Sequence, residues 1–276
     1  MATRAQQSSG WMADLSLGFK LIEGKTVLSH RERKGPLAVQ RSFYPESGVC
    51  HVYVLHPPGG VVGGDTLTVK TDLADRAEAL ITTPGATKFY RSAGSVAKQI
   101  QTLSLSKQAC LEWFPQENIY FPGANVQLKT EVNIKSSSLL ALWEFQCFGR
   151  PTLNEVFDSG CVDSSLSIAK DGKPIIVERL RFNKDTKDRL ALLASMPVTA
   201  TFVMNSVEVS SLDSVRELLP NDVKHHLSAT LIEDFLIIRY LGDSIDFAKR
   251  VFASIWSSMR LAAFGKTASP PRIWNT

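Results

Sequence analysis

Apolar and polar residues alternate in short runs along most of this chain, and brief stretches of Gly, Pro, Ser and Asp separate the runs. Thr66–Thr71 alternates with a period of two, which is typical of a strand with one buried face, whereas Leu139–Phe145 is apolar more continuously and predicts a strand covered on both faces. The predicted strands are Leu15–Ile22, Thr26–Arg31, Leu37–Phe43, Val49–Leu55, Thr66–Thr71, Ala77–Thr82, Ala97–Ser106, Ala109–Phe114, Asn125–Ile134, Leu139–Phe148, and a hairpin of Leu166–Lys170 and Pro174–Phe182 around Asp171-Gly172.

Helical periodicity is found mainly after residue 185. Lys187–Ser195 and Ser211–Leu219 are predicted as short helices because a proline follows each of them. The clearest helix runs from about Ser244 to Phe264 and ends at Gly265; its apolar stripe is Ile245, Ala248, Phe252, Ile255, Met259 and Ala262. This stripe fits packing on the protein's own sheets, and a partner-binding helix is the alternative. Two prolines, at 270 and 271, predict an extended tail after it.

The strand spacing indicates a mainly β fold: a sandwich, a barrel or a β-helical stack of short strands with two or three helices. No sequence repeat of fixed length is visible, and no linker or change of composition marks a domain boundary. We therefore expect one domain over residues 14–276. Residues 1–13 are small and polar without a period, so we expect this N-terminal tail to be disordered.

Composition excludes several classes of protein. The formal net charge of +4 is too small for a nucleic-acid-binding protein, and the densest basic run, His30–Lys34, is interrupted by Glu32. No stretch reaches the roughly 18 apolar residues of a membrane-spanning helix. The four cysteines are widely spaced and form no zinc motif, which favours a reducing compartment, so we expect a cytoplasmic protein without nucleic-acid or membrane partners.

Two turn-forming segments, called the turn blocks below, stand out as candidate functional motifs: HPPGGVVGGDT at 56–66 and TTPGATKFYRS at 82–92. Their glycines and prolines fix the backbone and place polar side chains on a rigid frame. The first block nearly matches a phosphate-binding loop, but Asp65 replaces the lysine and a strand-like segment follows, which argues against nucleotide binding. The motif residues are His56, Gly59, Gly60, Gly63, Gly64 and Asp65 in the first block and Pro84, Gly85, Lys88, Tyr90 and Arg91 in the second.

Three acidic residues, Glu112, Glu144 and Glu178, lie inside strand-like apolar runs. A buried carboxylate is unfavourable unless it is paired or hydrated. The residues alone leave two interpretations open: ion pairs with basic residues such as Lys88, Arg91, Arg150 or Arg179, or a water-filled passage lined by the acids. No set of histidines or cysteines has the spacing of a closed metal site, since His225-His226 are adjacent and point to different sides.

Several long segments also resemble the UreD (UreH) family of urease accessory proteins. They are HPPGGVVGGD, TTPGATKFYRS, LEWFPQENIYFPGA (111–124), FGRPTLNEVF (148–157), VERLRF (177–182) and PRIWNT (271–276). The resemblance covers nearly the whole chain. It implies an irregular two-layer β-helical fold and a non-enzymatic maturation factor that binds apo-urease and recruits a UreF-like protein and, through it, a UreG-like GTPase.

The resemblance further implies that nickel is in transit to urease and that no cofactor is bound permanently. Glu112, Glu144 and Glu178 are then candidate transit ligands, and Arg272, Ile273 and Trp274 in the tail are candidate contacts for the UreF-like partner. Two alternatives remain at this stage: a structural adaptor that works without nickel, and a hydrolase whose catalytic residues converge only in space.

Overall fold

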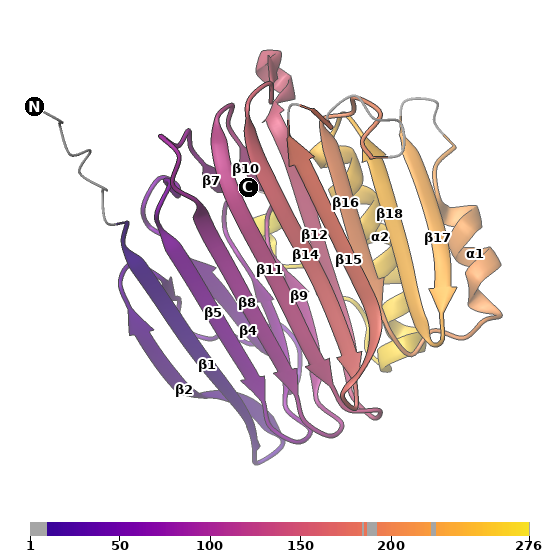
Figure 1. Ribbon diagram of the computed structural model, residues 1–276. Coiled ribbons are helices and arrows are strands. Elements are labelled where there is room, and N and C mark those ends of the chain that lie inside the picture. The colour runs from indigo at the N-terminus through magenta and orange to yellow at the C-terminus, as the bar shows by residue number, and fades with distance from the viewer. Residues whose placement is uncertain (1–9, 184, 187–191, 222–224, 276) are drawn as a thin grey trace, which may run out of the picture.

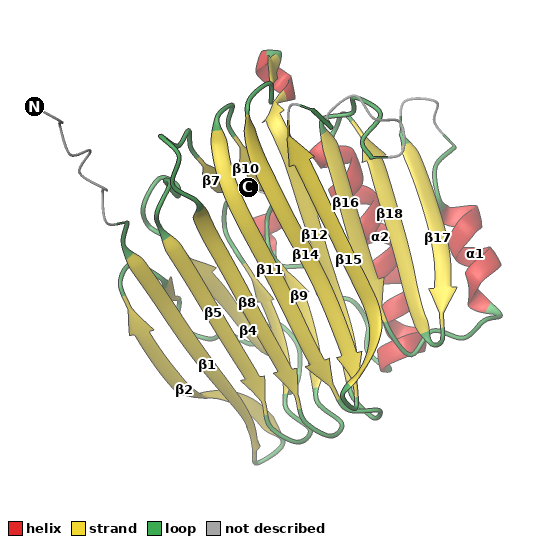
Figure 2. Ribbon diagram, viewed as in Figure 1, coloured by secondary structure: helices red, strands yellow, loops and turns green. Residues whose placement is uncertain are grey.

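Two β-sheets lie face to face in the computed structural model, which describes residues 10–183, 185–186, 192–221 and 225–275 (Figure 1). The strands of the first sheet follow the order β15-β14-β11-β8-β5-β1-β2 and those of the second the order β17-β18-β16-β12-β9-β6-β4-β3. Figure 2 shows helix α2 behind the second sheet and α1 beside its edge strand β17. The expected two-layer, mainly β fold is thus confirmed.

The bounds of the elements are as follows. The first sheet contains β1 (Met12–Ile22), β2 (Lys25–Lys34), β5 (Thr66–Leu73), β8 (Ala97–Leu105), β11 (Ala124–Ile134), β14 (Gly160–Lys170) and β15 (Lys173–Asn183). The second contains β3 (Ala38–Val39), β4 (Cys50–Leu55), β6 (Glu78–Thr82), β9 (Cys110–Phe114), β12 (Leu139–Arg150), β16 (Val198–Met204), β17 (His226–Ile232) and β18 (Phe235–Gly242), with the short β7 (Thr87–Phe89), β10 (Asn118–Tyr120) and β13 (Glu155–Val156) beside it. The helices are η1 (Pro151–Leu153), α1 (Ser211–Leu218), α2 (Ile245–Phe264) and η2 (Arg272–Asn275).

The central strands form β-helical coils, because the chain crosses from one sheet to the other after each strand. β4, β6, β9 and β12 pair in parallel in one sheet, and β5, β8, β11 and β14 pair in parallel in the other. Aromatic rings stack from coil to coil: Phe89 lies 5.4 Å from Tyr120 and Tyr120 lies 5.2 Å from Phe148, between ring centroids. The coils differ in length, which explains why the sequence shows no fixed repeat.

Two hydrophobic clusters hold the layers together. The first lies between the sheets, and the second lies between the outer face of the second sheet and α2. Ser244 Oγ accepts a hydrogen bond from Phe247 N at the start of α2, and Gly265 ends the helix with a positive φ of 67°. Both helix ends were predicted, and the helix packs on the protein's own sheet.

Some local predictions were wrong. Leu37–Phe43 forms only the two-residue β3, with an isolated bridge from Phe43 to His51. The C-terminal tail is not extended, since Arg272–Asn275 forms a 3₁₀ turn. β1 begins at Met12, inside the segment expected to be disordered. Of the predicted helix 187–195, residues 187–191 lie outside the described residues and 192–195 form a turn.

On α2, Ala262 is exposed while Arg260 is buried, the reverse of the prediction from the apolar stripe. Ionic partners for Arg260, described below, explain its burial.

Candidate functional site

The two turn blocks lie against each other and close one end of the space between the sheets. Val61 N donates to Lys88 O at 2.7 Å and Tyr90 N donates to Val61 O at 2.9 Å, so Val61 and Phe89 form a parallel bridge. Tyr90 also donates its hydroxyl proton to Gly59 O at 3.0 Å. These contacts make the two blocks a single unit although 15 residues of sequence, 67–81, separate them.

Asp65 has a structural role in this unit. Its side chain is buried, with Oδ1 accepting from Trp11 N at 3.1 Å and Oδ2 accepting from Val62 N at 3.0 Å. In a phosphate-binding loop, backbone N–H groups point to the phosphate. Here one such N–H group, that of Val62, donates to the carboxylate of Asp65. This agrees with the sequence argument against nucleotide binding.

The glycines of the blocks differ in what they require. Gly64 has a positive φ of 99°, and a Cβ at Gly60 would lie 2.3 Å from Tyr90 Cε2. Gly63 has no positive φ, but a Cβ there would lie 2.2 Å from Ser92 Oγ and 2.7 Å from Ser95 O. Gly85 has neither a positive φ nor any atom within 4 Å of an added Cβ. The expectation that a special backbone conformation requires these two glycines is therefore wrong for both: close packing restricts Gly63, and no atom within 4 Å restricts Gly85.

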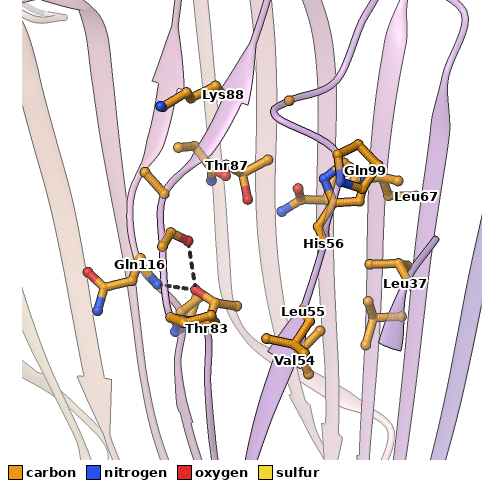
Figure 3. A pocket seen from close by; sticks show the side chains of 18 of the residues that line it. Leu37, Val54, Leu55, His56, Leu67, Thr83, Thr87, Lys88, Gln99 and Gln116 are labelled. Atoms are coloured by element: carbon orange, nitrogen blue, oxygen red, sulfur yellow. Dashed lines mark hydrogen bonds between the residues drawn. The ribbon is translucent and has the colours of Figure 1, made fainter. Parts of the chain in front are cut away.

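A first cavity of about 400 Å³ lies between the two sheets beside the turn blocks (Figure 3). Its walls come from β5 and β8 on one side and from β4, β9 and β12 on the other. The motif residues that line it are His56, Gly59, Gly60, Pro84, Gly85 and Lys88; Gly63, Gly64, Asp65, Tyr90 and Arg91 lie outside it. The motif thus divides into residues that form the cavity wall and residues that hold the blocks in place.

A second cavity of about 390 Å³ lies further along the same interlayer space, where β15 ends the first sheet and β16 and β18 continue the second. It is lined by polar groups that include Glu178, Thr201 and Arg239. Glu144 on β12 lines both cavities. The two spaces therefore meet at one carboxylate.

Glu144 has no cationic partner among the described residues. Its Oε1 accepts from Thr130 Oγ1 at 2.5 Å, and that hydroxyl lies 3.3 Å from Gln101 Oε1. The side chain is half-buried, and the surface that it retains faces the cavities. Burial raises the pKa of Glu144 to about 7, helped by repulsion from Glu178 and opposed by the Thr130 hydrogen bond. Near neutral pH this carboxyl is therefore partly protonated.

Glu178 is paired, but with a residue that the sequence argument did not name. Arg239 Nε donates to Glu178 Oε1 at 3.1 Å, a second guanidinium nitrogen also contacts Oε1, and Thr201 Oγ1 donates to Oε2 at 3.3 Å. Arg239 is 44% exposed, so the pair lies at the rim of the second cavity. Arg239 thus contacts Oε1 of Glu178, while Oε2 accepts from the Thr201 hydroxyl.

Glu112 lies on the opposite face of the second sheet, beneath α2, and lines neither cavity. Both Glu112 and Arg260 are 1% exposed, and Arg260 donates from Nε to Oε1 at 2.9 Å and from Nη2 to Oε2 at 2.7 Å. Trp256 Nε1 adds a third hydrogen bond at 2.6 Å. The ion-pair interpretation thus holds for Glu112, with Arg260 in place of the partners considered from sequence.

This pair belongs to a larger buried network. Arg260 Nη1 and Nη2 donate to Glu46 at 2.8 Å and 2.9 Å, and His51 Nε2 lies 2.9 Å from Glu46 Oε1. Two carboxylates raise the pKa of Arg260 in spite of burial, and hydrogen bonds from His51 and Arg260 outweigh burial and lower the pKa of Glu46. The guanidinium is therefore charged at all relevant pH values, and the network fixes α2 to the sheet.

His56 has an unusual environment at the wall of the first cavity. Its Nε2 is enclosed and has no hydrogen-bond partner among the described residues, and its ring lies 6.4 Å from that of Trp11. Burial lowers the pKa of His56, against an opposing attraction from Asp65. The imidazole is thus neutral at pH 7.

The C-terminal tail packs on the molecule itself. Trp274 is half-buried among Phe114, Trp143 and Trp256, and its Nε1 donates to Thr82 Oγ1 at 3.1 Å. Arg272 is exposed and Ile273 is half-buried. Of the three residues predicted to contact a partner, Trp274 therefore has its ring engaged internally.

Sequence reasoning did not identify several polar residues of the site. Thr130, Gln101 and Gln146 were predicted only as strand positions, and no strand was predicted at Arg239. The position of the polar Gln146 inside the apolar run Leu139–Phe148 was a signal. Within the described part of the chain, no three His, Cys, Asp or Glu residues are grouped to hold a metal ion. No helix in that part combines the length and the apolar character needed to cross a membrane.

Comparison with known proteins identifies the family. The model of the UreD urease accessory protein family matches residues 12–275. The chain belongs to the UreD family. Among similar proteins, the urease accessory protein UreD of Escherichia coli is 42% identical over 273 residues, covering 97% of this chain and 98% of that protein. UreD of Klebsiella aerogenes is 42% identical, with 97% of each chain covered, and that of Aliivibrio fischeri MJ11 is 40% identical, with 98% of each covered.

Membership in the UreD family supports a role in urease maturation. The relatives are accessory proteins, which favours a non-catalytic role and implies interaction with urease and with other accessory proteins.

Proposed function

We propose that this UreD-family chain is a cytoplasmic scaffold that binds apo-urease, recruits UreF-like and UreG-like proteins, and conducts nickel to urease through the space between its two sheets. The observation that carries the proposal is the position of Glu144, which lines both cavities. A carboxylate shared by two adjoining cavities gives a cation one ligand that is within reach from either side.

The chemistry of the lining suits transit. Carboxylate, amide and hydroxyl oxygens bind nickel less tightly than imidazole or thiolate, and conduction needs release as much as capture. No cation of the described residues pairs with Glu144, and Glu178 forms an ion pair with Arg239. Gln101, Gln146 and Thr130 supply neutral oxygens around them. The proposal requires no permanent cofactor. GTP would be bound by the UreG-like partner, because in this chain the loop N–H of Val62 donates to Asp65 and is not available to a phosphate.

The experiment replaces the two cavity acids by their amides. Glu144→Gln and Glu178→Gln, singly and together, are co-expressed with urease and the other accessory proteins. If nickel passes these acids, the complex assembles normally while urease contains at least several-fold less nickel and loses activity in proportion. Complex formation is measured by co-purification, and nickel by elemental analysis of the purified urease.

Glu131→Gln is the matched control, because Glu131 is an acid on β11 that pairs with Lys129 and lines neither cavity. Glu178→Gln combined with Arg239→Gln removes the pair without leaving an unpaired cation. Full nickel loading of urease with the Glu144/Glu178 double variant would refute the transit role and favour a structural adaptor. Hydrolytic turnover by the purified chain alone would support the enzyme alternative.

A further inference from the structure

Four large apolar side chains are exposed together at one corner of the first sheet, where the neighbouring parallel strands β1, β5 and β8 begin (Figure 1). They are Trp11, Met12, Val62 and Val96, with exposed fractions of 44%, 58%, 47% and 43%. The described part of the chain has twelve exposed large apolar side chains, and a third of them lie in this group, called the apolar corner below. Single exposed apolar residues are ordinary, whereas a contiguous group of them marks a surface that binds another molecule.

Backbone hydrogen bonds around one buried acid hold the apolar corner in place. Asp65 is buried, and its two carboxylate oxygens accept from Trp11 N at 3.1 Å and from Val62 N at 3.0 Å. Next to it, Gly64 N donates to Val96 O at 3.1 Å. The remaining residue of the corner directly follows Trp11 as the first residue of β1. Because these backbone positions are already fixed, a partner that binds here orders little additional backbone.

Exposed basic side chains flank the apolar corner. Lys98 lies at the start of β8, and Lys34 lies at the end of β2, which pairs with the start of β1. Arg91 belongs to the second turn block, which bonds to the first. None of these three cations forms an ion pair among the described residues. Asp14 lies opposite Lys34 in the ladder and Asp65 is buried, so cations exceed accessible acids at this rim in the described part of the chain.

We propose that the apolar corner is a docking site for another protein of the urease-maturation assembly, one whose contact surface has apolar side chains surrounded by carboxylates. An exposed tryptophan beside cations is typical of interface hot spots, and the partner's carboxylates would pair with Lys34, Arg91 and Lys98. A symmetric contact between two copies of this chain is disfavoured, since it would bring these cations towards each other. This inference rests on the scaffold role proposed above and is independent of the route that nickel takes.

The test measures how much of the chain each partner retains. The full chain, without a tag, is co-expressed with urease and the other accessory proteins and recovered through tagged urease or, separately, through the tagged UreF-like protein. Val62→Ser combined with Val96→Ser, and independently Trp11→Ala, should lower recovery at least fivefold through the partner that meets the corner. Both valines are about half exposed, so the double variant should keep a melting temperature within about 2 °C of the wild type.

Val177→Ser is the matched control, because Val177 is a valine that is 73% exposed on β15, at the opposite edge of the first sheet. It should leave both recoveries unchanged. Lys98→Glu should lower recovery several-fold and make it less sensitive to salt, since it removes one of the rim cations. Lys20→Glu, which changes an exposed lysine near the other end of β1, should have no such effect.

Wild-type recovery of the valine double variant through both partners would refute the docking site. The same holds if sedimentation of the full chain shows that this variant loses only self-association, or if deleting residues 2–9 raises recovery, because the corner would then bind a second copy or this chain's own N-terminal segment. If the corner variants lose a partner while the Glu144/Glu178 double variant loads urease with nickel normally, the nickel route fails and the docking site stands.

Discussion

At the scale of single residues, three acids that look alike in sequence have three different electrostatic environments. Glu112 is buried and paired with a charged guanidinium, and Glu178 pairs with a partly exposed arginine. Glu144 accepts a hydrogen bond from the Thr130 hydroxyl and has no cationic partner among the described residues. A buried carboxylate without a cation keeps its proton to higher pH. Of these three acids, Glu144 is therefore the one whose pKa is raised to about 7, so that its charge changes near neutral pH.

Glu144 should give the protein a characteristic dependence of stability on pH. Its pKa is about 7 in the folded chain against 4.5 for an ordinary glutamate, so the folded state binds this proton more tightly. The resulting stabilisation is complete below about pH 4.5, declines as pH rises to about 7, and is constant above that. Since the cavities can admit water, Glu144→Gln should raise the free energy of unfolding by on the order of 1–3 kcal/mol at pH 8 and leave it nearly unchanged at pH 4.5.

Urea unfolding of the wild type and of Glu144→Gln from pH 4.5 to 8 measures this difference. Glu131→Gln again serves as the control, because it removes an acid that is 39% exposed and paired with Lys129. Parallel stability curves for the wild type and Glu144→Gln over this range would show that the carboxyl titrates normally.

At the scale of elements, the sequence predicted correctly the features that depend on residues close together in the chain. The ends of α2 follow from the hydroxyl of Ser244 and the left-handed conformation of Gly265, and both were readable in the sequence. Leu37–Phe43 has the composition of a strand, but only Ala38 and Val39 pair continuously with β4, and Phe43 forms an isolated bridge to it. Strand composition predicts a tendency, whereas strand length depends on the neighbour that supplies hydrogen bonds.

The turn blocks offer a matched pair of glycines for a test of stability. Gly63→Ala places a Cβ against Ser92 Oγ and the backbone oxygen of Ser95, whereas Gly85→Ala meets no atom within 4 Å. We expect the first substitution to destabilise the protein by about 1–3 kcal/mol through overpacking. Its melting temperature should fall by roughly 2–12 °C, given about 2–4 °C per kcal/mol for a chain of this size, while that of Gly85→Ala changes by less than about 2 °C. Equal melting temperatures would mean that the loop at Ser92–Ser95 yields without strain.

At the scale of the whole molecule, the sequence predicted the layers but not how the strands face one another. Alternation along β9 and β12 shows that Glu112 and Glu144 each point away from their neighbouring tryptophans. It does not show which face is turned to the other sheet and which to α2, because that depends on the coiling of the whole chain. Glu112 and Glu144 were therefore assigned to one passage, whereas the sheet separates them.

The last residues of the chain test how the whole molecule is closed. Trp274 lies among Phe114, Trp143 and Trp256 and donates to Thr82, so the C-terminus joins segments that are distant in sequence. Trp274→Ala should lower the free energy of unfolding by about 2–3 kcal/mol, less than for a fully buried tryptophan because the ring is half-buried. Arg272→Ala, which changes an exposed residue, should leave stability within about 0.5 kcal/mol.

Binding of the UreF-like partner by Arg272, Ile273 and Trp274 stays a prediction, and the same two variants separate it from folding. Loss of partner binding in Arg272→Ala at wild-type stability would support a docking tail, whereas wild-type binding by Arg272→Ala together with an unstable Trp274→Ala would show that the tail serves the fold.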